Sequence, residues 1–566
     1  MAFDYQQLCK EMTWDVARRE LGHVEGAPLN LAYLCVDRHV EQGRGERLAM
    51  IHEGHEGEIR QFTYRDLQQL TNGWAHYLRG SVFIKQLDRV CLFLDKSPEL
   101  YIGFLGILKV GAVVEPLFSA FGEDALVARM LDSKATAIIT QKRHLGKVRK
   151  VRERLPDLKA VIVIDHDEDG RKLRDGEMAY RMMEHRNDQF PTAQTHAESP
   201  SVLHYTSGTT GPPKGAMHVH GSIVAQYLTS KVVLDIKEHD RYWCTADPGW
   251  VTGTSYGIIG PWALGATQVV LDAGFSSDRW YETIEKHRIT VWYTAPTAIR
   301  MLMKDGLDPV RKRDLSSLRH MCSVGEPLNP EAVRWGHEAF GLWFHDTFWQ
   351  TETGSIMVTN LPGMPVKPGS MGRPFPALEA TVVEPKTGQP ITETGRVGLI
   401  AIKPPWPSMM RTYWNNTATY YGKFLNGWYI CGDQASIDAE GYFWFCGRDD
   451  DVINTAGHLV GPFEIESALL EHPAVAESAA IGKPDPVNME VVKAFVALRP
   501  GFTANVDLEL DIMNYVRKKL SPLAMPQEIE FVDKVPKTRS GKILRRVLKA
   551  KELGQPIGDI STMDDD

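Results

Sequence analysis

Short apolar runs alternate with longer amphipathic segments along most of the chain, and glycine and proline separate them. Residues 90–94 form an apolar run typical of a buried strand, and residues 98–110 carry a helical apolar face that ends at Gly111. Further strands of this kind are predicted at residues 135–139, 160–164 and 266–271. The alternation predicts an α/β fold in which helices cover largely parallel sheets.

The pattern changes near residue 449. A polar break at residues 447–452 follows an aromatic hairpin at residues 441–445. Beyond it the pattern predicts a helix at 463–471, a strand at 491–498 and a helix at 507–520. This segment has the size of a small α+β domain of roughly a hundred residues. We therefore predict a large domain of residues 1–449 and a small domain of residues 450–566, which ends in an acidic tail.

Composition narrows the class of protein. A hydrophobic content of 43% and a charged content of 24% are ordinary for a globular protein, and a net charge of −8 argues against general nucleic-acid binding. The seven cysteines are scattered and form no C-x-x-C pair, which favours a reducing compartment. Neither a secretory signal nor an apolar run of about 18 residues is visible, so no membrane association is expected and a cytoplasmic enzyme is indicated.

A basic run covers residues 143–154. The favoured interpretation is a solvated helix face. The alternative is a docking surface for a multiply phosphorylated cofactor.

Residues 205–215, YTSGTTGPPKG, combine hydroxyl side chains, glycines and one lysine. Glycines let backbone N–H groups approach phosphate oxygens, hydroxyls add donors, and the lysine adds positive charge. The spacing differs from that of a P-loop. The segment predicts a nucleotide phosphate loop, with a polar surface turn as the alternative. Its candidate residues are Thr206, Ser207, Gly208, Thr209, Thr210, Gly211 and Lys214.

Further polar motifs follow this loop along the chain. They are Gly325-Glu326-Pro327, then Asp346-Thr347-Phe348-Trp349-Gln350-Thr351-Glu352, then Asp433 with Arg448, and finally residues 536–543 with Lys542. In this order and spacing the motifs resemble those of the adenylate-forming acyl-CoA synthetases, over nearly the whole chain. Within that superfamily the chain is most similar to the AMP-forming acetyl-CoA synthetases, in their shorter bacterial form.

The resemblance implies a two-step reaction that needs ATP, Mg²⁺ and coenzyme A. A carboxylate attacks the α-phosphate of ATP, pyrophosphate leaves, and an acyl-adenylate forms. The thiol of coenzyme A then attacks the acyl carbon, and AMP leaves. The resemblance also implies the fold: a large domain of sheets covered by helices, and a small, mobile C-terminal domain.

Roles follow from the resemblance, residue by residue. Residues 206–214 would hold the β- and γ-phosphates, residues 325–327 would flank the adenine, and residues 346–351 would also contact the nucleotide. Asp433 would accept hydrogen bonds from both ribose hydroxyls, with Arg448 beside it. Glu352 would help to hold Mg²⁺. Lys542 would enter from the small domain as the catalytic residue and bridge the substrate carboxylate and the α-phosphate.

The acyl group is expected to be small, because Trp349 stands where relatives with longer substrates have a glycine. Its indole would close the acyl pocket, although a plain core tryptophan is the alternative. The other expected walls are Trp250, Val251, Thr252 and Val324. One methylene is worth about 1–3 kcal/mol in discrimination, so propionate is expected to be a poorer substrate than acetate but not excluded.

For coenzyme A, the resemblance places Ala456 and Gly457 beside the pantetheine and Arg517 on a phosphate, with Asp450 as the hinge. The sequence departs from the family at Leu459, where many relatives have an arginine. One phosphate contact is therefore missing or supplied by His458 or another residue, a change that bears on ATP affinity and domain closure. Position 456 is a serine in many relatives.

Other functions remain open. One is a propionate, medium-chain or aryl acid–CoA ligase, and another is an adenylation domain that serves a carrier protein. A catalytically silent nucleotide-binding regulator is a third, although the presence of Lys542, Asp433 and Glu352 argues against it. Lys542 is also a plausible target of a lysine acetyltransferase and deacetylase, because acetylation would remove its charge.

Overall fold

The computed structural model describes residues 4–166, 173–206, 213–449, 451–455, 458–486, 488–538, 542–557 and 563. It confirms the predicted α/β class, with sheets covered by helices. No helix in these ranges is long and apolar enough to cross a membrane. The seven cysteines are all free thiols.

One large sheet carries the predicted phosphate loop. Its strands lie in the order β19-β9-β8-β4-β3-β5-β6-β7; from β8 to β7 they run parallel, while β19, β9 and β8 pair antiparallel. The bounds are β3 Arg89–Phe93, β4 Val113–Pro116, β5 Ala137–Thr140, β6 Ala160–Val163, β7 Glu177–Ala179, β8 Pro200–Thr206, β9 Lys214–Val219 and β19 Thr412–Tyr413.

The second large sheet has the order β16-β15-β14-β13-β12-β10-β11-β1-β2, with a parallel centre and antiparallel edges. The bounds are β1 Leu48–Glu53, β2 Ile59–Thr63, β10 Arg241–Cys244, β11 Thr267–Leu271, β12 Val291–Thr294, β13 His320–Val324, β14 Phe344–Phe348, β15 Val358–Thr359 and β16 Arg373–Pro374.

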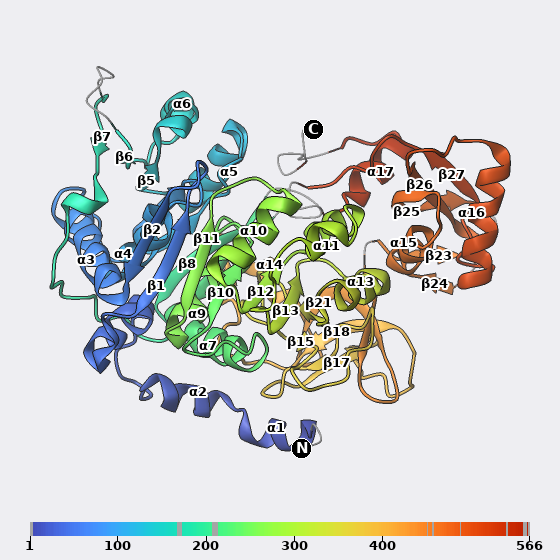
Figure 1. Cartoon of the computed structure of the whole chain (residues 1–566), viewed down its shortest axis with the longest axis horizontal. Coiled ribbons are helices and arrows are strands. Elements are labelled where there is room, and N and C mark those ends of the chain that lie inside the picture. Colours follow the sequence, from blue (N-terminus) through green and yellow to red (C-terminus); the bar gives the residue numbers. More distant parts are fainter. Residues whose placement is uncertain are drawn as a thin grey trace.

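Helices surround these sheets (Figure 1). They are α1 Tyr5–Glu11, α2 Trp14–Leu21, α3 Tyr64–Gly80, α4 Pro98–Val110, α5 Glu123–Ser133, α6 Lys142–Val151, α7 Ile223–Val232, α8 Val251–Thr254, α9 Gly260–Leu264, α10 Ser277–His287, α11 Pro296–Lys304, α12 Asp308–Arg311 and α13 Pro330–Phe340. A π-helical turn, η6, spans Ser255–Ile259. Buried side chains of α3, α4, α7 and both large sheets form one apolar core.

Local signals set several helix ends. Thr63 and Asp66 form a reciprocal capping box at the start of α3, where Asp66 accepts from the Thr63 amide at 2.8 Å. The predicted helix at 98–110 is α4, and Gly111 ends it at φ +80°. A left-handed residue at this place is the usual helix stop, and glycine adopts it without strain.

A third sheet, β17-β18-β21-β20 with β22 beside β21, extends the large domain. Its bounds are β17 Ala380–Val383, β18 Gly398–Ile402, β20 Phe424–Leu425, β21 Trp428–Ile437 and β22 Phe443–Arg448, with α14 at Thr417–Tyr421. The sequence pattern predicted only the hairpin at its end, which is the turn between β21 and β22.

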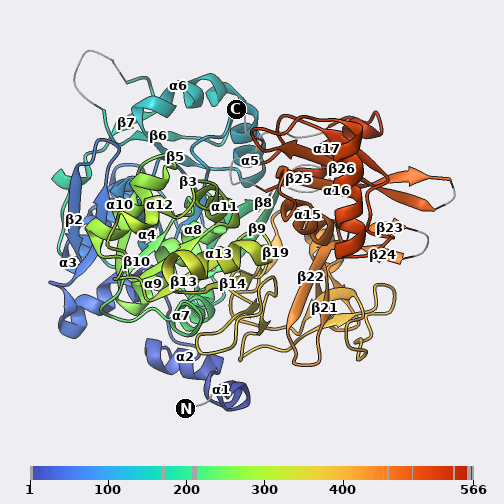
Figure 2. The same ribbon diagram turned by 45° about the vertical axis from the view of Figure 1, so that its right-hand side comes forward.

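The fourth sheet, β24-β23-β26-β25 with β27 beside β26, forms the C-terminal end of the molecule (Figures 1 and 2). Its elements are β23 Ile453–Thr455, β24 His458–Val460, α15 Pro462–Leu470, β25 Val475–Asp485, β26 Met489–Leu498, α16 Val506–Lys519, β27 Glu528–Phe531 and α17 Arg545–Glu552. The predicted helices at 463–471 and 507–520 and the strand at 491–498 match α15, α16 and β26. The boundary at residue 450 stays a prediction, because Asp450 lies outside the described residues.

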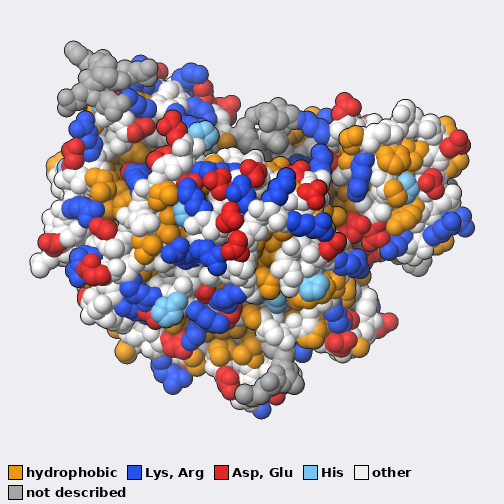
Figure 3. Space-filling view, viewed as in Figure 1, with side chains coloured by type: hydrophobic (Ala, Val, Ile, Leu, Met, Phe, Trp, Pro, Cys, Tyr) orange, Lys and Arg blue, Asp and Glu red, His pale blue; other side chains and the backbone are white. Residues whose placement is uncertain are grey.

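The basic run at residues 143–154 includes most of α6. Basic and acidic side chains are interspersed over the face shown in Figure 3. Four basic side chains of the run form ion pairs: Arg143 with Asp95 at 2.8 Å, Arg149 with Glu177 at 2.7 Å, Lys150 with Glu123 at 2.8 Å and Arg154 with Asp124 at 2.9 Å. This pairing favours the solvated helix face over a phosphate-docking surface.

Candidate active site

The predicted phosphate loop joins two antiparallel strands. β8 ends at Thr206 and β9 begins at Lys214, and these two residues face each other in the ladder. The Thr206 hydroxyl donates to the Lys214 carbonyl at 3.4 Å. The intervening candidates Ser207, Gly208, Thr209, Thr210 and Gly211 lie outside the described residues.

Tyr413 connects this hairpin to Glu352. Strand β19 pairs with β9 and places Tyr413 opposite Ala216. The Tyr413 hydroxyl donates to the Glu352 carboxylate at 2.7 Å, and the Lys214 ammonium lies 5.9 Å from the centre of the Tyr413 ring. Tyr413 could not be predicted from the sequence, since nothing there pairs it with a glutamate 61 residues away.

The loop after β13 contains Gly325, Glu326 and Pro327. Gly325 has φ +99°, a conformation that favours glycine. Glu326 accepts from the Thr297 hydroxyl at 2.8 Å and from Arg300 at 2.6 Å. Its carboxylate is therefore held by side chains of α11.

Asp346 and Thr347 lie on β14, directly beside Ser323 and Val324 of β13. Asp346 is buried and accepts from the Ser323 hydroxyl at 2.6 Å. Burial raises the pKa of Asp346 to about 7, against the opposing effect of hydrogen bonds from Ser323 and the amides of Thr347 and Leu328.

The residues predicted to lie at the ribose also lie close to one another. Asp433 on β21 faces Arg448 on β22 in the ladder, and the Gln350 amide donates both to the Asp433 carboxylate and to the Cys431 carbonyl. Burial raises the pKa of Asp433, while the charges of Arg448 and Lys542 act against that rise. The structure therefore brings Asp433, Arg448 and Gln350 together, and it places Lys542 within electrostatic reach of them.

Lys542 belongs to the small domain and immediately follows residues outside the described ranges. Its amide donates to the Thr538 hydroxyl at 3.0 Å, and its carbonyl accepts from the Thr538 amide at 2.8 Å. The residue keeps exposed surface. The protein surroundings of its ammonium nevertheless lower the pKa of Lys542, first by desolvation and then by the charge of Arg448, with Asp433 and Asp451 opposing.

Trp349 is buried and fixed by two tyrosines. The Tyr256 ring lies perpendicular to the indole at 5.0 Å, and the indole N–H donates to the Tyr293 hydroxyl at 3.1 Å. That hydroxyl is 2.7 Å from the Thr347 hydroxyl, which itself donates to the Ser323 carbonyl at 2.7 Å. The sequence analysis missed Tyr293, which lies 56 residues before Trp349.

The remaining pocket candidates divide into two groups. Val324 belongs to the same apolar core as Trp349, and the half-buried Val251 packs against that core. Thr252 is half-buried beside it in α8. The Trp250 ring instead packs against Phe118 at 5.5 Å and Phe121 at 6.2 Å, in a separate apolar cluster.

The coenzyme A candidates are only partly described. Arg517 is exposed near the C-terminal end of α16. The hinge candidate Asp450 and the candidates Ala456 and Gly457 lie outside the described residues.

Comparison with known proteins matches both domains. The model of the "AMP-binding enzyme" family matches residues 36–414, and that of the "AMP-binding enzyme C-terminal domain" matches residues 464–542. The acetyl-coenzyme A synthetase of Bacillus subtilis (strain 168) is 47% identical over 564 residues, which cover 99% of this chain and 97% of that protein. The acetyl-coenzyme A synthetase of Pyrobaculum aerophilum is 41% identical over 580 residues, 96% of this chain and 86% of that protein.

Solved structures agree on the fold. A crystal structure titled as the anthranilate CoA ligase AuaEII in complex with anthranoyl-AMP has a TM-score of 0.84 at 29% identity, over 93% of this chain and 98% of that one. A Brucella canis acyl-CoA synthetase has a TM-score of 0.75 at 30% identity, over 97% of this chain and 99% of that one. The chain therefore belongs to the AMP-binding enzyme family and, within it, to the acetyl-coenzyme A synthetases.

Proposed function

We propose that this chain converts acetate, ATP and coenzyme A into acetyl-CoA, AMP and pyrophosphate through an acetyl-adenylate. The observation that carries the proposal is the position of Lys542, a small-domain residue, close to Asp433 and Arg448 of the large domain. This combination supports nucleotide binding together with charge stabilisation at the reacting phosphate. The near full-length similarity to acetyl-coenzyme A synthetases supports acetate as the acid.

The triphosphate is assigned to residues 206–214, with Lys214 supplying positive charge. Mg²⁺ is assigned to Glu352. In the described part of the chain no group of three or more His, Cys, Asp or Glu side chains could hold a metal ion. A single carboxylate still fits, because Mg²⁺ is commonly bound by one or two carboxylates together with substrate phosphates and water. When bound, the ion would neutralise phosphate charge during the attack.

The nucleoside is assigned to the loop 325–327, the run 346–351 and the Asp433 carboxylate. A carboxylate can accept hydrogen bonds from two neighbouring hydroxyls, so Asp433 suits the ribose diol. The charges of Arg448 and Lys542 favour its ionised form. The Gln350 side-chain amide donates to this carboxylate and so helps to fix its orientation.

In the first step the acetate carboxylate attacks the α-phosphorus, and the bond to pyrophosphate breaks. Two anions approach each other, so a cation that contacts both lowers the barrier. Lys542 has this role in our proposal. Acetylation of its amine would remove the charge and stop the step, and a deacetylase would restore it.

The acyl pocket is assigned to Trp349, Val251, Thr252 and Val324. The indole is held by Tyr256 and Tyr293, so it forms a firm wall. Trp250 remains a candidate through its backbone and its place beside Val251, since its ring packs elsewhere. A short acyl chain fits this assignment.

In the second step the thiol of coenzyme A attacks the acetyl carbon, and AMP leaves with the bonding electrons. We assign the pantetheine to Ala456 and Gly457, a phosphate contact to Arg517, and the domain rotation to Asp450. Leu459 leaves one family phosphate contact to another residue. The free thiols of the chain support the expectation of a cytoplasmic enzyme.

The decisive test is the release of AMP, in the presence of coenzyme A, over a series of carboxylic acids of increasing length. We expect acetate to give the highest kcat/KM, propionate a lower one and butyrate a much lower one. A higher kcat/KM with butyrate or an aryl acid than with acetate would show that this acid, and not acetate, is the preferred substrate. No AMP release with any acid would support a silent nucleotide-binding regulator, and acyl transfer only to a carrier protein would support an adenylation domain.

A further inference from the structure

The Glu352 carboxylate stands on a tight turn formed by residues 350–354. The backbone N–H of Gly354 donates to the backbone carbonyl of Gln350 at 3.1 Å, and the backbone N–H of Gln350 donates to the Thr353 hydroxyl at 2.9 Å. Gly354 has φ +69°, and a Cβ atom there would lie 2.3 Å from the Ser408 carbonyl oxygen. The turn is therefore closely packed, and its position decides where Glu352 points.

Side chains behind the turn hold its backbone at both ends. His218 Nε2 lies 2.8 Å from the Thr351 carbonyl oxygen. The Gln226 amide and the Ser255 hydroxyl each donate to the Gly354 carbonyl at 3.3 Å. His218 and Gln226 are distant in sequence from the turn, and neither belongs to a motif named above.

The contacts of the His218 ring determine which of its nitrogens carries the proton. A carbonyl oxygen only accepts, so Nε2 carries the proton. Burial lowers the pKa of His218 to about 4, which keeps the ring neutral near pH 7. Nδ1 is then an acceptor, and no described residue donates a hydrogen bond to it.

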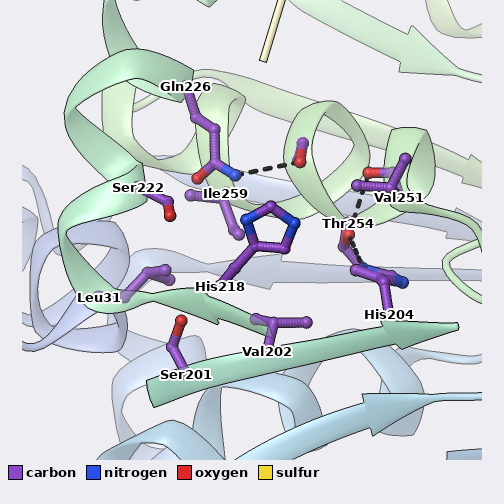
Figure 4. A pocket seen from close by; sticks show the side chains of 11 residues that line it. Leu31, Ser201, Val202, His204, His218, Ser222, Gln226, Val251, Thr254 and Ile259 are labelled. Atoms are coloured by element: carbon purple, nitrogen blue, oxygen red, sulfur yellow. Dashed lines mark hydrogen bonds between the residues drawn. The ribbon is translucent and has the colours of Figure 1, made fainter. Parts of the chain in front are cut away.

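A small cavity lies on the other side of the ring (Figure 4). Its volume is about 10 Å³, enough for one water molecule. Polar groups that have no partner in the described chain line it, and all are at least nine-tenths buried: His218 Nδ1, Gln226 Oε1, Ser201 Oγ and Ser222 Oγ. In Figure 4 these side chains surround the same space.

The lining groups match the hydrogen bonds of one water molecule. His218 Nδ1 and Gln226 Oε1 can only accept, so they would take the two water protons. The two serine hydroxyls can donate to the water oxygen. A buried polar atom left without a partner destabilises the folded state, so a bound water stabilises this arrangement.

We propose that His218, backed by one ordered water in this cavity, is a positioning residue that fixes the turn presenting Glu352 to magnesium-bound ATP. The inference rests on the proposed function, because it takes Glu352 as the magnesium-side carboxylate. It adds a polar support, built from β9 and α7, that lies behind the nucleotide site.

The test measures the Kd of ATP by titration calorimetry, with magnesium and with EDTA, in the absence of acid. His218→Leu removes both polar contacts, and we expect its Kd for magnesium-bound ATP to rise on the order of tenfold. The Kd in EDTA is expected to change less than about twofold. His218→Gln, whose amide can reach the Thr351 carbonyl, is expected to stay within about threefold of the wild type.

Matched variants separate positioning from folding. His39 is another buried histidine whose Nε2 contacts a backbone carbonyl, but that carbonyl belongs to Trp262 and not to the turn. His39→Gln is expected to leave both Kd values unchanged even if it lowers the Tm. Should His218→Leu fail to fold, His218→Asn keeps a polar atom toward the cavity but cannot reach Thr351, and the same tenfold loss is expected.

Two results would overturn the proposal. One is a leucine variant that binds magnesium-bound ATP as the wild type does, and the other is a glutamine variant as impaired as the leucine variant. Equal weakening with and without magnesium would also contradict it. A high-resolution crystal structure is expected to show one water bonded to His218 Nδ1. Lack of acetate-dependent turnover in the wild type would contradict the proposed function alone, because the binding measurement needs no acid.

Discussion

The position of the Lys542 side chain depends on a loop, and the backbone of Lys542 itself helps to hold that loop. Both backbone bonds between Lys542 and Thr538 are independent of the lysine side chain. The next helix, α17, is anchored by Arg545, which contacts Glu466 at 2.5 Å and Asp451 at 3.4 Å. The amine can therefore be removed without releasing the loop.

Lys542→Ala is expected to lower acetate-dependent ATP–pyrophosphate exchange by on the order of a thousandfold, because the charge that joins the two anions is lost. Acetyl-CoA formation from supplied acetyl-adenylate is expected to survive within about tenfold. Lys537→Ala, which removes a nearby ion pair with Glu477, is the control and should preserve both rates. Equal loss of both half-reactions in the Lys542 variant would contradict the assignment.

Trp349 is the residue to change for chain length. Trp349→Gly removes the indole that Tyr256 and Tyr293 hold, and we expect the kcat/KM ratio of butyrate to acetate to rise by at least about tenfold. Trp250→Phe is the matched control, because its ring packs on Phe118 and Phe121. Acetate preference that persists in the glycine variant would show that another side chain closes the pocket.

Single residues also show where sequence reasoning stops. The family resemblance predicted that Asp433 and Arg448 lie side by side and that Lys542 reaches the same nucleotide, although Lys542 comes from the other domain. Tyr413, Tyr293 and His218 were missed, because each contacts the site across 56 to 133 positions of chain. Only the folded sheet order brings such residues together, and a single sequence carries no signal for it.

Among the elements, β3 and β4 contain a buried acid. Glu115 on β4 is paired in register with Cys91 on β3, and the Cys91 thiol lies 3.2 Å from its carboxylate. Burial raises the pKa of Glu115 from about 4.5 in the unfolded chain to about 7. Between these values the folded state binds the additional proton, so its stability falls as the pH rises and the full penalty applies above pH 7.

Glu115→Gln should remove that penalty. We expect the variant to be more stable than the wild type by up to about 3 kcal/mol at pH 8, and nearly equal to it at pH 4, as measured by denaturant unfolding. Glu56→Gln, at an exposed position, is the control and should show no such dependence on pH. A difference that stays constant with pH would mean that the carboxyl is not buried in its neutral form.

Elements differ in how well the pattern predicted them. Helix α4 was predicted with its exact ends, because Pro98 and Gly111 mark a long apolar segment on both sides. The strands of the third sheet were largely missed; β20 has two residues and β17 four, which are too few to show a period. The neighbour relation of β1 and β11, separated by more than two hundred residues, depends on packing that no local pattern encodes.

At the scale of the whole molecule, the described arrangement suits the first half-reaction. Lys542 lies near Asp433, whereas Arg517 is exposed on α16 at the outer end of the small domain (Figure 1). One active site that serves two reactions needs a second arrangement of this domain. The extent of the small domain was predicted from a change of pattern, but its rotation was inferred only from family resemblance.

Arg517→Ala tests this second arrangement. We expect the KM for coenzyme A to rise about tenfold, because a charged contact to phosphate is lost, and ATP–pyrophosphate exchange to stay unchanged. Lys518→Ala, an exposed neighbour on the same helix, is the matched control. An unchanged KM for coenzyme A in the Arg517 variant would show that another residue contacts the phosphate.

The short connection after β22 has a thermodynamic consequence. Arg448 faces Asp433 in the ladder, and only residues 449–452 separate it from the first strand of the small domain. The domain rotation that we propose would therefore begin close to Arg448, which we assign to the ribose site. AMP and coenzyme A do not contact each other, but each should in this way change the affinity of the protein for the other. Thermodynamic linkage requires the two changes to be the same factor, so the release of AMP is coupled to the binding of coenzyme A.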